Sequence, residues 1–289
     1  MTTSGTDAAA FRRALRRARP ALRRDLPWVG HDDPWAIFVS EVMLQQTSTS
    51  RVLGPWRAFL TAYPTPSDLA AAPLDEVLAR WRGLGYPRRA RALREAAILM
   101  RDSHGGRVPR DRDDLLALPG VGEYTANAVA SFAFAEPVTV LDTNVGRVLA
   151  RAVANSPLTR AAARALGDEV RAAQPSAAFN QSLLDLGAQF CRATPRCENC
   201  PVAAACRWRR EGGPDPAPTS AAVSRPQAAY AGSDRQLRGR ILARLESRPS
   251  PTQFAAHFAD VEPVRLEAAL CSLARDGLVD LAGPRLATH

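Results

Sequence analysis

Leu118-Pro119-Gly120-Val121-Gly122 is the short segment that decides how this chain folds, because it joins two stretches of helical apolar spacing. Its glycines, Gly120 and Gly122, allow a positive φ, and the helix that follows exposes unpaired backbone N–H groups at its start. Those amides can grip a phosphate. A plain turn between two helices explains the loop equally well when the loop is taken alone.

Helical spacing extends over most of the chain on both sides of this loop. The apolar residues recur at a spacing nearer 3.6 than 2 in residues 35–44, 52–60, 74–81, 90–100, 113–118, 124–134, 145–153, 161–172 and 180–190. We therefore predict an all-α fold. After residue 232, helices at 235–245, 252–258 and 264–275 and a hairpin at 277–286 follow the order of a winged helix-turn-helix.

Composition divides the chain into a long body and a short tail. The 289 residues suffice for about two domains. Residues 211–232 combine Pro, Ala, Gly and Ser with little hydrophobicity, which is typical of a linker. We therefore expect a separate winged-helix-like tail at 233–289.

All 38 basic residues are arginine and none is lysine, which bears on both the partner and the chemistry of the chain. With 29 acidic residues they give a formal charge of +9, which favours nucleic acid first and an anionic membrane second. Genome composition explains a high arginine content equally well. Arg88, Arg89 and Arg91 could contact phosphates, or they could form a solvated helix face. A chain without lysine cannot attack an opened sugar through a Schiff base.

No segment has the pattern of a membrane anchor or an export signal. No apolar run reaches the roughly 18 to 20 residues of a bilayer span. Residues 11–24 lack the aromatic-rich face of a membrane-surface helix, and residues 8–20 alternate alanine with arginine, unlike a signal peptide. We expect a cytoplasmic monomer that associates with nucleic acid and has no membrane partner.

Four of the five cysteines lie within sixteen residues, spaced C-x5-C-x2-C-x5-C at Cys191, Cys197, Cys200 and Cys206. Disulfides are rare in the cytosol, so the cluster is first a candidate metal site. With one C-x2-C and no histidine nearby, a [4Fe-4S] cluster fits better than structural zinc, which stays the alternative. Cys271 stands alone in a predicted helix and is expected to be a small buried hydrophobe.

Asp142 ends an apolar run and opens a helix in the segment Val140-Leu141-Asp142-Thr143-Asn144-Val145. On local grounds an acid in this position is more typical of a helix N-cap than of a catalytic group. The neighbouring motifs decide between these two interpretations.

Taken in order, the glycine-containing hairpin, the acid that follows it and the four-cysteine loop resemble the helix-hairpin-helix DNA glycosylases that carry an iron–sulfur cluster. Within them, Ser40-Glu41-Val42-Met43-Leu44-Gln45-Gln46-Thr47 and Gly83-Leu84-Gly85-Tyr86 are similar to the adenine DNA glycosylases of the MutY type. The resemblance extends from about Leu26 to Trp208. It implies a two-lobed fold, with a helical barrel lobe at 26–137 and an iron–sulfur lobe formed by 8–25 and 138–210.

The resemblance implies that two carboxyl groups share the chemistry. Glu41 matches the acid that protonates adenine, although in isolation it would be interpreted as a solvated helix acid. Asp142 matches the carboxylate that stabilises the oxocarbenium-like sugar and may bond it covalently, and Asn144 matches the residue that positions it. This division is chemically consistent, because adenine is a poor leaving group and the apolar residues 42–44 can keep an acid protonated.

The resemblance also implies a set of DNA and adenine contacts. Extruding a base costs a few kcal/mol, which intercalating side chains offset, and Gln46 and Tyr86 match such residues. Trp28 and Gln181 match residues that contact the extruded adenine, although Trp28 and Tyr86 in isolation are more typical of core aromatics. The expected binding residues are therefore Trp28, Gln46, Tyr86, Gln181, Gly120 and Gly122.

The implied function is that of a monofunctional glycosylase in base excision repair, which removes adenine mispaired with 8-oxoguanine or guanine from double-stranded DNA. Tyr124, expected to line the catalytic pocket, stands where bifunctional relatives carry a nucleophilic lysine. One alternative is a thymine or uracil mismatch glycosylase, which would not need Glu41. Another is a noncatalytic iron–sulfur DNA-binding regulator, in which Glu41 and Asp142 need not converge.

Three features depart from the family pattern. The first cysteine gap holds five residues where the pattern has six, and Val29 stands where some relatives have a basic or amide residue. Typical members carry a β-rich C-terminal domain that reads 8-oxoguanine, for which the tail at 233–289 is too short. We expect this tail to grip DNA, contact a partner or brace the core.

Overall fold

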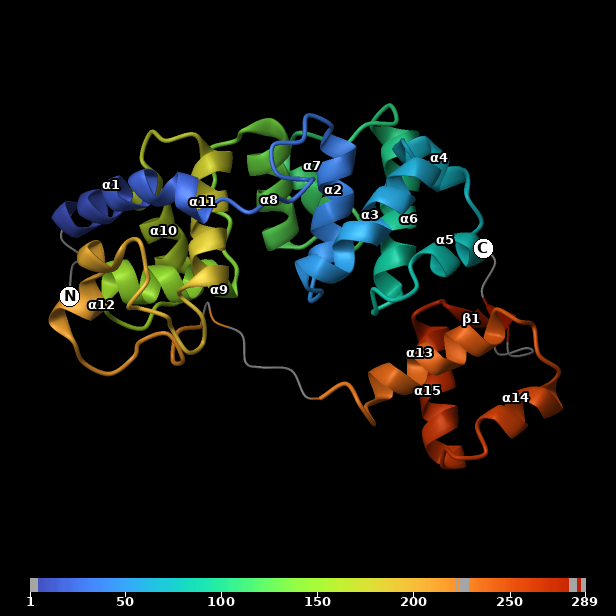
Figure 1. Cartoon of the computed structure of the whole chain (residues 1–289). Helices are drawn as coiled ribbons and strands as arrows, with labels where there is room; N and C mark the ends of the chain where they lie inside the picture. Colours follow the sequence, from blue (N-terminus) through green and yellow to red (C-terminus); the bar gives the residue numbers. More distant parts are fainter. Residues whose placement is uncertain (1–4, 222, 224–228, 281–284, 287–289) are drawn as a thin grey trace. The chain divides into compact units, whose positions relative to one another are not determined.

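The structure is a computed structural model that describes residues 5–221, 223, 229–280 and 285–286 (Figure 1). The described residues are mostly helical, with one two-stranded ribbon among them, which confirms the predicted all-α fold. The chain divides into two compact units. The first unit comprises Met1–Ile37 and Gly122–Pro226, and the second comprises Phe38–Val121 and Gln227–His289.

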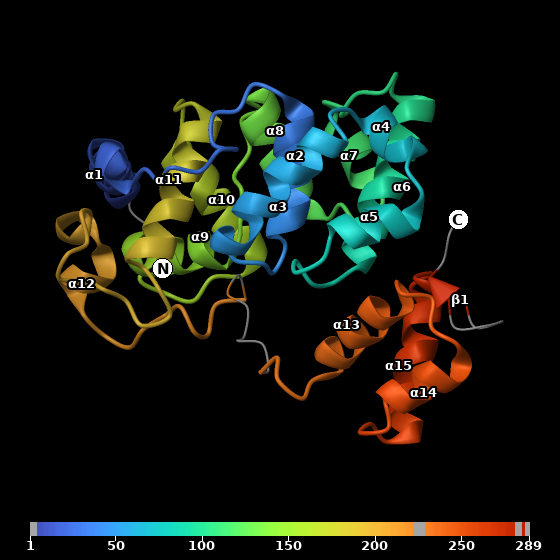
Figure 2. The same ribbon diagram turned by 45° about the vertical axis from the view of Figure 1, so that its right-hand side comes forward.

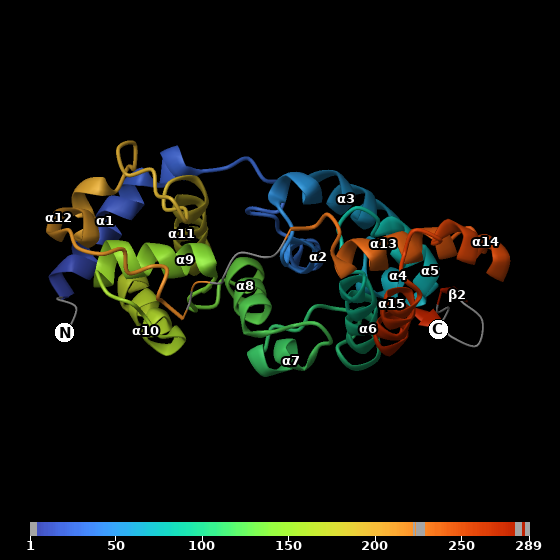
Figure 3. The same cartoon turned by 90° about the horizontal axis from the view of Figure 1, so that it is seen from below.

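The first unit is a bundle built around a long N-terminal helix. Its helices are α1 (Gly5–Leu22), α8 (Glu123–Phe134), α9 (Thr143–Val148), η1 (Leu149–Ala154), α10 (Arg160–Arg171), α11 (Ser176–Gln189), η2 (Ala203–Ala205) and α12 (Arg207–Glu211). Helix α1 buries Phe11, Leu15 and Leu22 in one core with Phe179 and Leu183 of α11. Complete burial of Phe11 alone contributes roughly 1.5–3 kcal/mol. Helix α12 lies beside α1 (Figure 3), where Arg210 pairs with Asp7 at 2.7 Å.

The predicted helix at 145–153 consists of two different kinds of helix. Helix α9 continues directly into η1, a π-helical turn whose six residues are all buried. Single π turns of this kind are often found at functional sites. Asn155 ends the turn with a left-handed φ of 49°. One of the buried η1 residues is Arg151, whose contacts are described below.

The second unit contains the helices on either side of the Gly83–Tyr86 loop. They are α2 (Pro34–Leu44, whose first residues belong to the first unit), α3 (Thr49–Ala62), α4 (Pro66–Ala71), α5 (Leu74–Arg80), α6 (Arg88–Ser103) and α7 (Arg112–Ala117). Helix α4, which packs against α6 (Figure 2), was not predicted. It is short, but its N-terminus is stabilised by a capping box between Thr65 and Asp68 and by Pro66 in the first turn.

The tail forms the helices predicted from the sequence. These are α13 (Asp234–Leu245), α14 (Pro251–His257) and α15 (Pro263–Arg275), followed by an antiparallel pair, β1 (Val279–Asp280) and β2 (Arg285–Leu286). Residues 281–284 of the predicted hairpin lie outside the described residues. Arg91 donates to the Asp276 carbonyl at 2.6 Å and pairs with the Glu95 carboxylate, and its side chain is partly exposed, so a phosphate contact by Arg91 stays a prediction. Cys271 is exposed, so its predicted burial is wrong, because it lies on the outer face of α15.

The segment expected to be a linker is packed over part of its length. Residues Gly213–Ala221, here called the strap, lie on the first unit, with Ala217 only 1% exposed. The Leu158 amide donates to Ser220 Oγ at 3.1 Å, and the Ala221 amide donates to the Leu158 carbonyl at 3.0 Å. Small residues suit close packing as well as a linker, so composition could not distinguish the two.

The units divide the chain between residues 37 and 38 and between residues 121 and 122, whereas the expected lobes divide it at 25/26 and 137/138. The assignment of separate roles to those lobes stays a prediction. Over the part of the chain that is described, no helix has the length and apolar character needed to span a bilayer.

Candidate functional site

Asp142 is held by two donors in the first unit. One carboxylate oxygen, Oδ1, accepts the Val145 backbone N–H at 2.7 Å, so Asp142 is the N-cap of α9. The other oxygen, Oδ2, accepts the side-chain amide of Asn144, also at 2.7 Å. The capping role considered from the sequence is therefore present, and it fixes the direction of the carboxylate.

The charge state of Asp142 reflects two opposing effects. Burial raises the pKa of Asp142, while the hydrogen bonds from Val145 and Asn144 and the charge of Arg147 lower it. Arg147 also donates to Asn144 Oδ1 at 2.6 Å and to the Cys191 carbonyl at 2.7 Å. Burial is the larger effect, so the pKa of Asp142 lies above its ordinary value, and the donors around the carboxylate limit that rise.

Two residues of α11 that were not predicted as site residues support the segment that carries Asp142 and Asn144. Gly187 of α11 lies so close to α9 that a Cβ there would be 2.6 Å from the Asn144 Cβ and 2.8 Å from the Asn144 carbonyl oxygen. Asn180, fully buried, accepts the Val140 amide at 3.0 Å and holds the segment that leads to Asp142. Both lie on the helix that also carries Gln181.

Of the other residues expected in the first unit, Gln181 has the best-defined environment. Its side-chain amide donates to Asp185 Oδ1 at 2.9 Å, and Arg24 pairs with the same oxygen at 2.6 Å. The buried Asp185 carboxylate, shared with Arg24, thus orients the Gln181 amide. Trp28 is buried, and Tyr124 is partly buried in the first turn of α8.

In the second unit, Glu41 lies in the middle of α2 and only 4% of its surface is exposed. The interpretation as a solvated helix acid is therefore wrong. Gln46 and Tyr86 both have a left-handed backbone, with φ of 57° and 49°. Non-glycine residues rarely adopt this conformation, and those that do are often found at functional sites. Gln46 is exposed and Tyr86 partly exposed, so neither is a core residue.

A cavity of about 280 Å³ lies next to these two side chains. It is lined by Val42, Gln45, Gln46, Tyr86, Arg88, Arg89, Ala92 and Gly120. Its wall therefore joins the end of the Glu41 helix, the Gly83–Tyr86 loop and the hairpin loop.

Arg89 is turned inward rather than toward solvent, because it is 7% exposed and both of its terminal nitrogens donate inside the protein. It donates, at 2.9 to 3.0 Å, to the carbonyl oxygens of Val42, Met43, Leu84 and Gly85 and to Thr47 Oγ1. Its guanidinium also lies over the Trp81 and Tyr86 rings. Burial lowers the pKa of Arg89 to about 10, so it stays charged at neutral pH. Arg89 thus ties the C-terminal end of the Glu41 helix to the Tyr86 loop.

The two hairpin glycines differ in conformation. Gly120 has a φ of 76°, and a Cβ there would lie 2.8 Å from the Ala92 Cβ, so glycine is required. Gln45 donates to the Gly120 carbonyl at 3.2 Å. Gly122 is the N-cap of α8 with a φ of −102°, so it does not use the positive φ that a glycine allows. Extended backbone admits any residue, and Gly122 only leaves the helix start uncovered.

The four clustered cysteines line one cavity in the first unit. Cys191, Cys197, Cys200 and Cys206 all contribute to its wall, and all four are free thiols. Burial raises the pKa of the Cys191 thiol to about 11, against a hydrogen bond from Arg151 that lowers it. Among the described residues, no three His, Cys, Asp or Glu side chains converge closely enough to hold a single metal ion.

Comparison with known proteins identifies similar proteins over most of the chain. Residues 39–171 match the family of HhH-GPD superfamily base excision DNA repair proteins. An adenine DNA glycosylase of Mycolicibacterium smegmatis is 45% identical over 253 residues, which cover 84% of this chain and 83% of that protein.

Two solved structures have similar folds. A thermostable thymine-DNA glycosylase superposes with a TM-score of 0.65 and 29% identity, over 71% of this chain and 98% of its own. A trapped endonuclease III–DNA covalent intermediate superposes with a TM-score of 0.62 and 27% identity, over 73% of this chain and 99% of that one. These matches confirm the predicted helix-hairpin-helix glycosylase fold.

Proposed function

Since the chain belongs to the adenine DNA glycosylases of the HhH-GPD superfamily, we propose that it removes adenine mispaired with 8-oxoguanine or guanine from duplex DNA. Family membership makes it a DNA glycosylase of base excision repair. The observation that carries the residue assignment is the Asp142 carboxylate, which two donors hold in place.

Glu41 is the proposed general acid. Protonation of adenine at N7 turns a poor leaving group into a good one, so that the bond between the base and C1′ can break. A carboxyl group removed from water favours its neutral form, and Glu41 is almost fully buried in α2. Its proton would leave with the base.

Asp142 is the proposed stabiliser of the sugar. When the base departs, positive charge develops at C1′ and the ring oxygen, and an ionised carboxylate nearby lowers the energy of that state. Asn144 and the Val145 amide direct the carboxylate, and their hydrogen bonds favour its ionised form. This role does not require a covalent bond between Asp142 and C1′, because water supplies the final hydroxyl with or without that bond.

The product is proposed to be an intact abasic site. A lyase step needs an amine that attacks the opened sugar, and the chain contains no lysine. Tyr124, in the first turn of α8, is proposed to line the pocket instead.

The remaining site residues are proposed to bind DNA. Gln46 and Tyr86 would fill the gap left by the extruded base, since their left-handed backbones present them from two adjacent loops. The amides that follow Gly120 and Gly122 would hold a phosphate at the start of α8. Trp28 and Gln181 would contact the adenine, with the Gln181 amide oriented by Asp185.

Cys191, Cys197, Cys200 and Cys206 are proposed to hold a [4Fe-4S] cluster. Four soft thiol donors lining one cavity suit such a group, and a cuboidal cluster spaces its ligands more widely than a single zinc ion does. When bound, the cluster would cross-link the loop from residue 191 to residue 206. Zinc is the alternative that metal analysis would distinguish.

The second candidate is a thymine or uracil mismatch glycosylase, which the similarity to the thymine-DNA glycosylase structure favours. The buried Glu41 argues against it, because thymine and uracil have no N7 for an acid to protonate. A noncatalytic regulator would release no base from any duplex.

The test is to incubate the purified protein with duplexes that carry A opposite 8-oxoguanine, G, C or T, and T or U opposite G, followed by alkali. We expect strand breaks at A opposite 8-oxoguanine or G, and only after alkali. Cleavage confined to T or U would establish the second candidate. Breaks without alkali would contradict the monofunctional assignment.

A further inference from the structure

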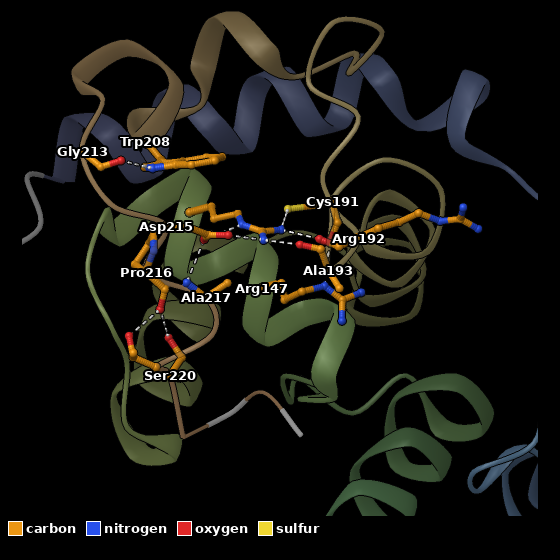
Figure 4. Close-up of polar contacts among 12 residues, drawn as sticks. Arg147, Cys191, Arg192, Ala193, Trp208, Gly213, Asp215, Pro216, Ala217 and Ser220 are labelled. Atoms are coloured by element: carbon orange, nitrogen blue, oxygen red, sulfur yellow. Dashed lines mark hydrogen bonds and ion pairs between the residues drawn. The ribbon is translucent and has the colours of Figure 1, made fainter. Parts of the chain in front are cut away.

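Arg151 is a buried arginine in the π-helical turn η1, with 1% of its surface exposed. A guanidinium in this position must use its donors within the protein, because a buried cation without partners is strongly unfavourable. The proposed reaction gives it no role. Its bonds lead in two directions, to the cysteine loop and to the strap, Gly213–Ala221 (Figure 4).

On one side, Arg151 holds the start of the cysteine loop. It donates to the Arg192 carbonyl at 2.6 Å, to the Ala193 carbonyl at 3.1 Å and to Cys191 Sγ at 3.5 Å. The Cys206 thiol in turn donates to the Arg151 backbone carbonyl at 3.8 Å. The first and the fourth cysteine of the cluster therefore both contact this one residue.

On the other side, Asp215 of the strap grips the same guanidinium with both oxygens. Arg151 Nε lies 2.8 Å from Oδ1, and a terminal nitrogen lies 2.6 Å from Oδ2. A two-bond pair of this kind fixes the plane of the guanidinium as well as its position. With that plane fixed, the other terminal nitrogen is directed at Cys191 Sγ and the Arg192 carbonyl, while the nitrogen that pairs with Asp215 also donates to the Ala193 carbonyl.

The strap that supplies Asp215 is itself anchored at both ends. Trp208 donates to the Gly213 carbonyl at 3.1 Å (Figure 4), and the guanidinium carbon of Arg151 lies 5.6 Å from the centre of the Trp208 ring. Asp215 accepts the Ala217 amide at 3.0 Å, and Ser220 and Ala221 bond to Leu158. Asp215 is therefore part of an ordered structure and does not belong to a loose linker.

We propose that Arg151 is a positioning residue for the iron–sulfur ligands, and that Asp215 of the strap holds it in place. This inference rests on the proposed [4Fe-4S] cluster. The strap, although it follows the last cysteine, then belongs to the cluster site. Four thiolates around iron form an anionic group, so a fixed cation at Cys191 favours its retention.

The principal test compares Asp215→Asn with a matched control, Asp260→Asn. Asp260 also makes a two-bond pair with an arginine, at 3.0 Å to Arg240, but that pair is exposed and lies in the tail. Each protein is purified without oxygen, and iron and sulfide are measured. The absorbance at about 400 nm is then followed after a chelator is added.

We expect Asp215→Asn to lose its cluster at least about tenfold faster than the wild type. Losses of this size are typical when a residue that supports a metal ligand is replaced. Asp260→Asn should match the wild type. Asp215→Glu, which keeps the charge, should restore part of the retention. Equal loss rates in Asp215→Asn and wild type, with unchanged far-ultraviolet circular dichroism, would overturn the proposal.

A second measurement needs no substitution and covers the case in which Asp215→Asn does not fold. If cluster and strap stabilise each other, removing the cluster from the wild type must loosen the strap. Amide exchange at Ala217 and Ala221 should then accelerate, while amides within α10 change little. Unchanged exchange in the strap would contradict the coupling.

Adenine release by the wild type as purified, before any cluster is removed, separates this inference from the proposed function. A wild type that is purified without oxygen, contains no iron and sulfide and still releases adenine would overturn the role of Arg151 and leave the glycosylase assignment intact. A protein that retains its cluster through Asp215 but releases no base would overturn only the glycosylase assignment.

Discussion

The side-chain amide of Asn144 donates to Asp142 at 2.7 Å and cannot turn around, because Arg147 donates to its oxygen at 2.6 Å. The amide hydrogens must therefore face the carboxylate. Asn144 thus acts on Asp142 as a fixed dipole, and its effect on the reaction should appear in the pH dependence.

Asn144→Ala should move the acidic limb of adenine release to higher pH. Burial already raises the pKa of Asp142, and this substitution removes a donor that lowers it, so the pKa rises further. The ionised form is then lost earlier as pH falls. We expect a displacement of about one pH unit. Single-turnover rates across pH measure it.

The control for this displacement is Arg164→Gln, which removes an exposed ion pair with Glu123 in the same unit. Its pH profile should match that of the wild type. An acidic limb that stays in place in Asn144→Ala would show that Asp142 does not need to be ionised for the reaction.

Glu41→Gln should abolish adenine release and leave duplex binding within a few fold. The amide has the same size but no proton to give, and loss of a general acid costs about 10²- to 10⁴-fold in rate. Glu76→Gln, at an exposed acid on α5, is the control. Normal cleavage by Glu41→Gln would refute its assignment as the acid.

Arg89→Met should destabilise the second unit by roughly 2–5 kcal/mol, because it leaves several buried carbonyl oxygens without their donor. Arg88→Met, at the exposed neighbour, should change stability by less than about 0.5 kcal/mol. Denaturant unfolding measures both. Equal stability of the two variants would mean that the bonds of Arg89 do not hold the Tyr86 loop.

Cys197→Ser should bleach the absorption at about 400 nm that thiolate-bound iron–sulfur clusters produce, and it should weaken DNA binding. Cys271→Ser, at the exposed cysteine of the tail, should leave both unchanged. Elemental analysis of the wild type decides the metal. A colourless protein loaded with zinc would reject the cluster.

The sequence predicted most of the helices, because their apolar spacing is regular over two turns or more. It missed α4, whose six residues are too few to show a period, although the capping box at Thr65 was a usable signal. The predicted helices also did not include α1 or α12. It assigned the strap to a linker on composition. Packing of small residues depends on what lies beneath them, which composition does not contain.

Motif resemblance led to Glu41 and Asp142, and the structure adds the burial of one and the donors of the other. Arg89, Arg147 and Arg151 were not predicted to have internal roles. In a chain with 38 arginines, each of them looks like surface charge until its partners are known. That Glu41 and Asp142 meet around one base stays a prediction.

Gly187 has no reactive side chain, yet both the Asp142 site and the cysteine loop depend on the absence of a side chain at this position. Any side chain there would push α11 away from α9, tilting Asn144 on one side and shifting the loop at Cys191 that Arg147 holds on the other. Variants at this residue would therefore combine impaired base release with weaker retention of the proposed cluster. A mutational study limited to residues with reactive side chains would not include Gly187.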